Sequence, residues 1–412
     1  MKILNVVGAR PNFVKIAPLI GEMRKGSGIT PLLVHTGQHY DREMSDSFFR
    51  DLDIPRPDYH LRVKLGSSAS QVSEIIARLE PVMVQERPDA VLVVGDVNST
   101  LAGALTAAKL GIPVAHVEAG LRSFDRRMPE EINRVVTDAI SDLLFVSEPS
   151  GVENLLREGR PGNRVFLVGN VMIDTLKRAL TQTSDATIPF SQVTSVCQLR
   201  TSPPRYAVLT LHRQGLVDDA ILFGKIWSVL EEIGQRIPII FPVHPRTHLR
   251  LRSFGRESSS DHGRENGSEG IHMTAPLGYL EFLSLQKQAA FVLTDSGGIQ
   301  EETTALGVPC LTLRENTERP FTVTHGTNKI VGLDPKRIRR EAEKLLAGDL
   351  KQGHAPKLWD GRAAERIVRI LCERFQTPGE VYHCQDESMM LALGLLRQRP
   401  LDPTIRPLCV QR

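Results

Sequence analysis

Carboxylate side chains stand at the ends of two apolar, strand-length runs in the first half of the chain. Asp96 and Glu118 occupy these ends, and Glu130 lies in the first turn of a helix that Pro129 opens. Carboxylates that are brought together with partial burial have shifted pKa values and suit proton transfer. Helix capping is the alternative role for Asp96, and compensation of the helix dipole explains one of Glu130 and Glu131. The pattern predicts a group of acid and base residues.

Two cations follow the first strand-length run. A glycine turn brings Arg10 to the start of a helix, and Lys15 follows about one turn later. The segment is neither GxGxxG nor GxxxxGK, so the dinucleotide and P-loop fingerprints are absent. Both cations can meet an anionic ligand at the helix N-terminus. Two solvated cations on a capped helix are an equally weighted alternative.

The strongest signal is the sequence Ser296-Gly297-Gly298, which joins a strand-length run to a helix. Bare backbone amides and a hydroxyl group at the positive end of a helix form a cradle for phosphate oxygens. Two glutamates, including Glu302, lie about one turn inside this helix, where a ribose attached to the phosphate would sit. The second half therefore predicts binding of a nucleotide-linked substrate, whose other end meets the carboxylates of the first half.

Further cations of the second half point to the same anionic ligand. His212 and Arg213 end a strand-length run, and Arg319 lies in a loop beside the predicted cleft. A single histidine is usually structural, but the adjacent arginine favours anion binding. An HxxxH segment follows later, yet the proline directly after its first histidine disfavours the helix that a zinc site would need. We predict no metal site.

The elements that must position these residues are short β-branched runs alternating with helical stretches. This alternation is typical of parallel sheets wrapped by helices, and ligands of such sheets bind at the carboxyl ends of the strands. We expect an α/β fold with two Rossmann-like, doubly wound parallel-sheet domains that face each other across a cleft. The expected strands are 3–7, 32–36, 90–95, 113–118, 143–147 and 165–168, then 206–211, 237–243, 271–274, 291–294, 308–311 and 329–331.

The expected domain organisation follows from the same pattern. An N-terminal domain with the carboxylates covers 1–182, and a second domain that binds the nucleotide covers 205–375. Residues 183–204, which are rich in Ser, Thr, Gln and Pro, form a linker or surface excursion. Residues 376–412 form a tail to which the sequence assigns no role.

Composition excludes several classes of protein. The chain has 412 residues, 24% of them charged, and a net charge of +3, which is too small for a broad nucleic-acid or membrane surface. No run of 18 apolar residues occurs, so we expect no membrane span. The five cysteines are an odd number without CxxC spacing, and the N-terminus does not look like a signal peptide. We therefore expect a cytoplasmic protein.

At these residues the sequence resembles the non-hydrolysing UDP-N-acetylglucosamine 2-epimerases, which have the two-domain GT-B architecture. The resemblance covers about residues 1 to 370. It is carried in order by the motifs GARPNFVK, HTGQHYD, GDVNST, HVEAGLRS, MPEEINR, TLHR, DSGGIQEE and NTERP. It implies interconversion of UDP-N-acetylglucosamine and UDP-N-acetylmannosamine without a cofactor, through elimination of UDP to 2-acetamidoglucal and its re-addition. It also implies a homodimer.

The resemblance assigns roles residue by residue. It makes Asp96, Glu118 and Glu130 the acid and base candidates, and His212 a catalytic or phosphate-contacting residue. The implied substrate-binding residues are Arg10 and Lys15 near the diphosphate, Ser296, Gly297 and Gly298 as phosphate cradle, Glu302 at the ribose, and Arg134, Arg213, Phe282 and Arg319.

Other functions stay open at this point. A sister group epimerises UDP-2,3-diacetamido-2,3-dideoxyglucuronate and shares several motifs, although the sequence TERP favours the N-acetylglucosamine enzymes. A GT-B glycosyltransferase shares the fold but usually needs one base rather than three carboxylates. A hydrolytic epimerase and a sensor without turnover are further alternatives. The chain reads Met44-Ser45-Asp46-Ser47 where members activated by a second UDP-N-acetylglucosamine have glutamines, so that activation is not expected.

Overall fold

A computed structural model describes residues 1–26, 28–37, 49–64, 66–185, 205–243, 245–254 and 270–375. Contacts between residues group Met1–Gln376 into one compact unit. The described residues do not include 186–204 of the predicted linker or the predicted tail at 376–412. Most of the HTGQHYD motif also lies outside them.

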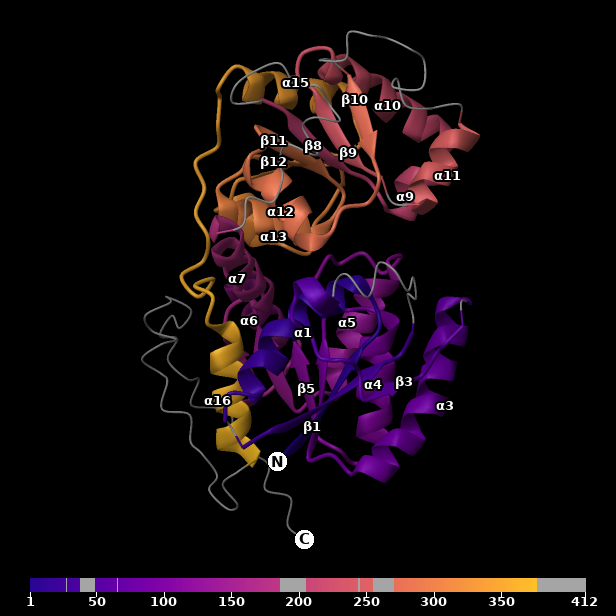
Figure 1. Cartoon of the computed structure of the whole chain (residues 1–412), viewed down its shortest axis with the longest axis vertical. Helices are drawn as coiled ribbons and strands as arrows, with labels where there is room; N and C mark the ends of the chain where they lie inside the picture. The colour runs from indigo at the N-terminus through magenta and orange to yellow at the C-terminus, as the bar shows by residue number, and fades with distance from the viewer. Residues whose placement is uncertain are drawn as a thin grey trace, which may run out of the picture. The chain divides into compact units, whose positions relative to one another are not determined.

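The first domain is built on a parallel sheet. In the described part of the chain it has seven strands in the order β3-β2-β1-β4-β5-β6-β7 (Figure 1). Consecutive apolar residues form the central strand β4, which is buried along its whole length because helices cover both faces of the sheet. The strands are β1 (Lys2–Val7), β2 (Thr30–His35), β3 (Tyr59–His60), β4 (Ala90–Val94), β5 (Val114–Val117), β6 (Leu143–Val146) and β7 (Val165–Leu167).

Helices connect these strands, and apolar side chains on both faces of the sheet form the core. Several helices begin directly after a strand, so their N-termini gather at the carboxyl edge of the sheet. The helices are α1 (Arg10–Met23), α3 (Ser68–Glu86), α4 (Asn98–Lys109), α5 (Pro129–Ile140), α6 (Pro149–Arg157) and α7 (Val171–Asp185), with a short 3-10 helix at Gly162–Arg164.

The second domain repeats this plan. Within the described residues its sheet has six parallel strands in the order β10-β9-β8-β11-β12-β13. The strands are β8 (Ala207–Thr210), β9 (Ile239–Pro242), β10 (Ile271–Thr274), β11 (Phe291–Thr294), β12 (Cys310–Thr312) and β13 (Asn328–Ile330). The helices are α9 (Gln214–Val217), α10 (Ala220–Gly234), α11 (Pro245–Ser253), α12 (Tyr279–Lys287), α13 (Gly297–Leu306), α14 (Pro320–Thr324) and α15 (Pro335–Leu346).

The last described helix, α16 (Ala363–Phe375), packs in the core of the first domain. Asp174 of α7 holds its first turn by accepting hydrogen bonds from the amides of Ala363 and Ala364 at 3.1 and 2.7 Å. From the sequence these residues are expected in the second domain, because a helix face shows that it is apolar but not which sheet it covers. The exact domain boundaries stay a prediction.

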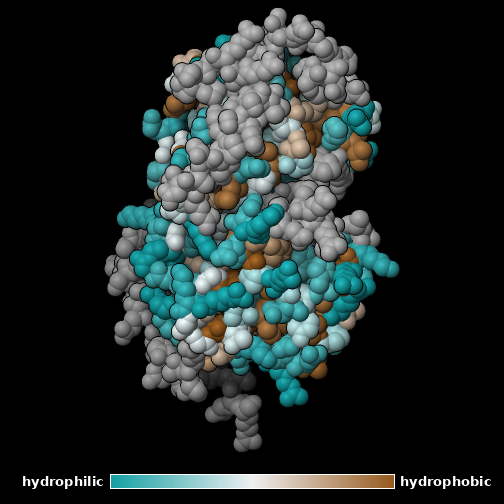
Figure 2. Space-filling model, viewed as in Figure 1, coloured by the Kyte–Doolittle hydropathy of each residue, from teal (hydrophilic) through white to brown (hydrophobic). Residues whose placement is uncertain are grey.

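The predicted fold class is confirmed, with two parallel-sheet α/β domains. Every expected strand is present, and the first sheet gains β3, whose two residues are too short to show a pattern. On the face shown in Figure 2 the described surface of the first domain is mostly hydrophilic, with small apolar patches. Among the described helices, none has the length and apolar character needed to cross a membrane.

Candidate functional site

The turn after β5 gives Glu118 an unusual backbone conformation. Its φ of +74° lies in the left-handed region, which costs free energy for a residue other than glycine and is often found at functional sites. The amides of Glu118 and Ala119 both donate to the carbonyl oxygen of Phe145, at 3.0 Å each. These bonds hold the turn so that the Glu118 side chain lies at the carboxyl edge of the sheet.

Two cations contact the buried Glu118 carboxylate. Lys15 Nζ lies 2.7 Å from Oε2, and Arg319 Nη2 lies 2.6 Å from Oε1. Burial alone would raise the pKa of Glu118, but Arg319 and Lys15 outweigh it and hold the pKa below its usual value. Glu118 is therefore ionised. Arg319 belongs to the second domain, so this ion pair also joins the two domains.

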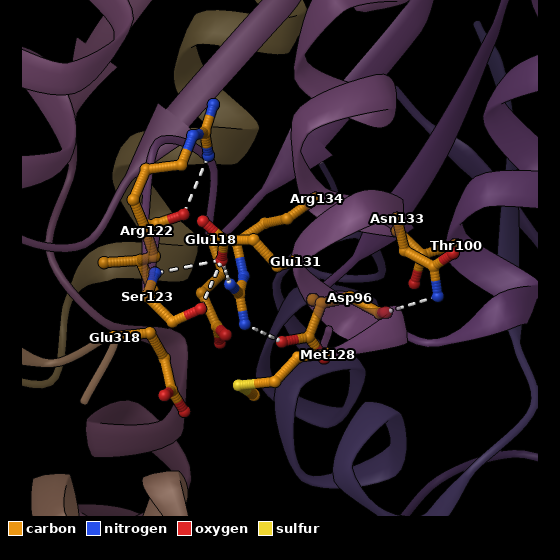
Figure 3. Close-up of polar contacts among 12 residues, drawn as sticks. Asp96, Thr100, Glu118, Arg122, Ser123, Met128, Glu131, Asn133, Arg134 and Glu318 are labelled. Carbon is orange, nitrogen blue, oxygen red and sulfur yellow. Dashed lines mark hydrogen bonds and ion pairs between the residues drawn. The ribbon is translucent and has the colours of Figure 1, made fainter. Parts of the chain in front are cut away.

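Asp96 stands at the tip of the neighbouring strand β4. Arg134 Nη2 donates to its Oδ2 at 2.6 Å, and Figure 3 shows the two side chains pointing toward each other. Burial opposes ionisation, but Arg134 and Lys15 keep the pKa of Asp96 below its usual value. The Asp96 side chain is 20% exposed, so an ionised carboxylate remains reachable by a ligand.

The two glutamates that open α5 have different surroundings. Glu131 is buried and accepts hydrogen bonds from the amides of Ser123 and Phe124 at 2.9 Å, and also from Arg134 (Figure 3). Glu130 is half-buried and, among the residues that the structure describes, its side chain makes no hydrogen bond or ion pair. Glu131 therefore supports the loop before α5, whereas Glu130 keeps its carboxylate available.

His212 lies at the end of β8 in the second domain. Its Nδ1 is 2.8 Å from Asp295 Oδ1, and Asp295 Oδ2 accepts hydrogen bonds from the amides of His212 and Arg213 at 2.9 and 2.8 Å. The charge of Asp295 raises the pKa of His212. The imidazole is 52% exposed, so a protonated ring with one anchored nitrogen can meet an anion. Asp295 is not among the residues predicted from the sequence, although it directly follows β11.

The predicted phosphate cradle lies at the start of α13. Ser296 is the N-cap residue, but its side chain makes no capping hydrogen bond. The Ser296 hydroxyl therefore accepts no hydrogen bond from the backbone amides in the first turn of α13. A Cβ atom on Gly297 would lie 2.3 Å from Glu318 Oε1, so the carboxylate approaches too closely for any residue but glycine. Gly298 faces Met172, whose methyl carbon would be 3.0 Å from a Cβ atom there.

Arginines surround Glu318 beside this helix end. Arg314 donates to its Oε2 at 2.7 Å, and Arg213 Nη2 lies 3.8 Å from Oε1. Arg213 and Arg314 also approach the sulfur of Met128, at 3.9 and 4.0 Å. Because Met128 directly precedes α5, these contacts bring the cations of the second domain to the helix that carries Glu130.

Two adjacent glutamates of α13 are buried with raised pKa values. Burial raises the pKa of Glu302 to about 7, and Tyr279 donates a hydrogen bond to it at 3.3 Å. Burial raises the pKa of Glu301 to about 8, although Arg319 Nε lies 2.8 Å away and Asn170 donates to it at 2.9 Å. The motif predicts a role for Glu302 and none for Glu301, since nothing in the sequence shows which of two neighbours faces Arg319.

The remaining predicted residues are placed less centrally. Phe282 is partly buried and packs on the apolar cluster around Tyr206 in the second domain. Arg10 is the first residue of α1, and the placement of its side chain lies outside the described residues. Among the described residues, no group of three or more His, Cys, Asp or Glu side chains could hold a metal ion.

Comparisons with known proteins identify the family. A family model described as UDP-N-acetylglucosamine 2-epimerase matches residues 21–372. The chain is 42% identical over 376 residues to the UDP-N-acetylglucosamine 2-epimerase of Methanocaldococcus jannaschii, covering 90% of this chain and 99% of the relative. It is 38% identical to the UDP-2,3-diacetamido-2,3-dideoxy-D-glucuronate 2-epimerase of Pseudomonas aeruginosa, covering 90% and 100%.

Comparisons with solved structures point to the same family as the sequence comparisons. The crystal structure of the M. jannaschii UDP-GlcNAc 2-epimerase in complex with UDP-GlcNAc and UDP matches with a TM-score of 0.82 at 42% identity, covering 90% of this chain and all of the other. The Neisseria meningitidis enzyme bound to UDP-GlcNAc matches with a TM-score of 0.81 at 32% identity, with the same coverage. Since the family model spans most of the chain and the relatives are covered almost completely, the chain belongs to the UDP-N-acetylglucosamine 2-epimerase family.

Proposed function

We propose that this protein interconverts UDP-N-acetylglucosamine and UDP-N-acetylmannosamine without hydrolysing them. The observation that carries the proposal is the pair of ionised carboxylates, Asp96 and Glu118, at neighbouring strand tips. Inversion at C2 requires that a proton leave one face of the sugar and return to the other, so one acid or base group is not enough. Glu130, with its available carboxylate, completes the proposed set.

The proposed reaction proceeds by elimination and re-addition. A carboxylate takes the C2 proton, the C1–C2 double bond forms, and the C1–O bond breaks with its electron pair leaving on the diphosphate. The diphosphate oxygen then returns to C1 while a proton is delivered to the opposite face of C2. Abstraction without loss of UDP would leave a carbanion at C2, the carbon that bears the acetamido group and whose proton is not acidic, which is why the leaving group is needed.

The second domain is proposed to hold and stabilise UDP. The charge that develops on the departing diphosphate meets the His212 imidazolium, Arg213 and the first-turn amides of α13. Glu302 is proposed to accept hydrogen bonds from the ribose hydroxyls. Arg10, Lys15, Arg134, Phe282 and Arg319 stay proposed substrate contacts. Arg319 and Lys15 also keep Glu118 ionised, which a base requires.

A direct test uses heavy water. UDP-N-acetylglucosamine incubated with the protein in D₂O is expected to gain one deuterium at C2 and to equilibrate with its manno epimer while UDP stays attached. Free N-acetylmannosamine and UDP as main products would instead indicate a hydrolytic epimerase. Absence of exchange until a sugar acceptor is added would indicate a glycosyltransferase.

A second substrate calls for a parallel assay. The Pseudomonas relative, which is named for UDP-2,3-diacetamido-2,3-dideoxy-D-glucuronate, is 38% identical over nearly the same length. We propose the simpler substrate because the sequence TERP resembles the N-acetylglucosamine enzymes. Faster exchange with the diacetamido glucuronate would replace the proposed substrate but keep the proposed reaction.

Asp96→Asn tests the proposed role of Asp96. This change keeps an acceptor for Arg134 in a partly exposed position, so the fold should persist. We expect C2 exchange to fall by at least about 100-fold, because general acid–base groups contribute about 10²–10⁴-fold. The affinity for UDP, measured by calorimetry, should change little. Wild-type exchange in this variant would remove Asp96 from the mechanism.

A further inference from the structure

A buried carboxylate outside the predicted site is linked to both strand tips that carry Asp96 and Glu118. Asp138 lies on α5 and is fully buried. Its Oδ1 is 2.7 Å from His116 Nδ1, and its Oδ2 accepts a hydrogen bond from the Gly120 amide at 3.0 Å. Gly120 stands two residues after Glu118, so Asp138 contacts the turn that carries Glu118 directly.

His116 carries the second contact to the neighbouring strand tip. Its Nε2 is 2.8 Å from the carbonyl oxygen of Gly95, the residue before Asp96. Each ring nitrogen of His116 therefore faces an oxygen atom, one on Asp138 and one on Gly95. Both side chains of the His116–Asp138 contact are fully buried. His116 and Asp138 thus link the backbone beside Asp96, at Gly95, to the backbone beside Glu118, at Gly120.

The turn after β5 needs this support. Glu118 and Gly120 have φ values of +74° and +79°, so two left-handed residues lie within three positions. Phe145 fixes the amides of Glu118 and Ala119, and Asp138 fixes that of Gly120. Backbone in such conformations persists only where its surroundings determine it. Without the Asp138 acceptor, the Gly120 amide would lose the partner that closes the turn.

Arg122 is a second side chain that contacts the Asp138 carboxylate. Its Nη1 lies 2.7 Å from Asp138 Oδ2, and its Nε and Nη2 donate to Glu158 at 2.8 and 2.7 Å. Burial opposes ionisation of Asp138, but His116 and Arg122 hold its pKa below the usual value. Glu158 is partly exposed and touches neither strand tip. It belongs to the same network but has no contact with the turn.

We propose that Asp138, acting through His116 and through the Gly120 amide, is a positioning residue that sets the separation of Asp96 and Glu118. Elimination and re-addition move a proton off one face of C2 and onto the other, so this separation determines whether both steps are in reach. The inference rests on the proposed function. It assigns no contact between Asp138 and the substrate.

The test compares Asp138→Asn with Glu158→Gln. The first change keeps the shape of the side chain but replaces one of the two carboxylate oxygens, which face His116 and the Gly120 amide, with an NH2 group, so these contacts should weaken. We expect kcat for epimerisation and for C2 exchange to fall about 100-fold, as misplacement of reacting groups by about 1 Å can cause. KM and the UDP affinity should stay at wild-type values. Glu158→Gln should leave kcat unchanged, although both variants lose one charge of the same network.

Two further measurements distinguish positioning from folding. His116→Phe should lower kcat as Asp138→Asn does, and the double variant should lose no more than either single one, because the two residues act as one unit. Amide hydrogen exchange at Gly120 should accelerate in Asp138→Asn and not in Glu158→Gln. This readout needs no substrate, so it tests positioning even if the wild-type protein proves inactive on UDP-N-acetylglucosamine.

Several outcomes would overturn the inference. Wild-type kcat in Asp138→Asn, or an equal loss in Glu158→Gln, would show that the strand tips do not depend on Asp138. A parallel loss of UDP affinity would show a general structural role. If Asp138→Asn does not fold, His116→Phe decides alone, and wild-type kcat in that variant would refute the proposal.

Discussion

At the scale of single residues, the neighbours Glu130 and Glu131 offer a sharp contrast. Glu131→Gln replaces an acceptor of backbone amides and of Arg134, so unfolding should require about 3 kcal/mol less, as for a broken buried ion pair. Glu130→Gln should leave stability unchanged and reduce C2 exchange at least about 100-fold. Urea unfolding and the heavy-water assay measure the two effects. Wild-type exchange in Glu130→Gln would show that Glu130 is not needed for proton transfer at C2, which would then depend on Asp96 and Glu118.

Glu301 gives a pH-dependent prediction at the same scale. Burial raises its pKa from 4.5 to about 8, so the folded state keeps a proton that the unfolded chain releases. Stability contributed by this proton is present below pH 4.5 and is lost as pH rises toward 8, by up to about 1.4 kcal/mol per pH unit. Glu301→Gln lacks the titrating proton, so its stability relative to wild type should increase between about pH 5 and 8.

Urea unfolding at several pH values tests this expectation. Glu153→Gln on the exposed side of α6 removes the same charge and should show no such trend. A constant difference between Glu301→Gln and wild type across this range would mean that Arg319 keeps Glu301 ionised in the folded protein.

At the scale of an element, the start of α13 depends on a glycine. Gly297→Ala would place a methyl group where Glu318 Oε1 now lies, in a corner that Arg314 holds in place. Overpacking of this kind costs about 1–3 kcal/mol, so we expect UDP to bind about tenfold more weakly. Gly224→Ala in α10 is the control, since nothing lies within 4 Å of a Cβ atom there. Equal UDP affinity in wild type and Gly297→Ala would show that the N-terminus of α13 does not bind the diphosphate.

At the scale of the whole molecule, the exposed apolar face of α5 is a candidate interface between two copies of the chain. Ile132, Val135 and Val136 share this face at helical spacing and are 37 to 43% exposed. The family resemblance implies a homodimer, and we predict that a second copy of the chain covers these three side chains. Val135→Glu should shift the mass measured by light scattering from dimer to monomer, whereas Leu249→Glu on α11, where the leucine is 68% exposed, should not. A monomeric wild-type protein would contradict the prediction.

Closure of the two domains is a separate prediction at this scale. Arg319 pairs with Glu118, and Glu301 accepts from Asn170, so both links join the second domain to the first. A glucal intermediate must be kept from water, which requires the domains to close around the sugar. Small-angle scattering should therefore show a smaller radius of gyration when UDP-N-acetylglucosamine is added to an apo sample. An unchanged radius would count against closure of the domains around the substrate.

Much of the fold followed from local patterns. Buried parallel strands appear as short apolar runs, and each predicted strand tip lies where its run ends, which is why Asp96, Glu118, His212 and Ser296 could be selected. Patterns failed where the signal is short or ambiguous. Two-residue β3 has no periodicity, and the apolar face of α16 could cover either sheet.

The fold class, the alternation of elements and the family can be read from the chain, because periodicity and ordered motifs are local properties of a sequence. Three other findings come from the folded molecule: Glu131 supports a loop while Glu130 stays available, Arg319 joins Glu118 to Glu301, and Asp138 is linked to both strand tips of the site. These roles depend on distances between residues far apart in the chain. Carboxylates of the same type differ here through burial and the nearest cation, and neither quantity is written in local sequence.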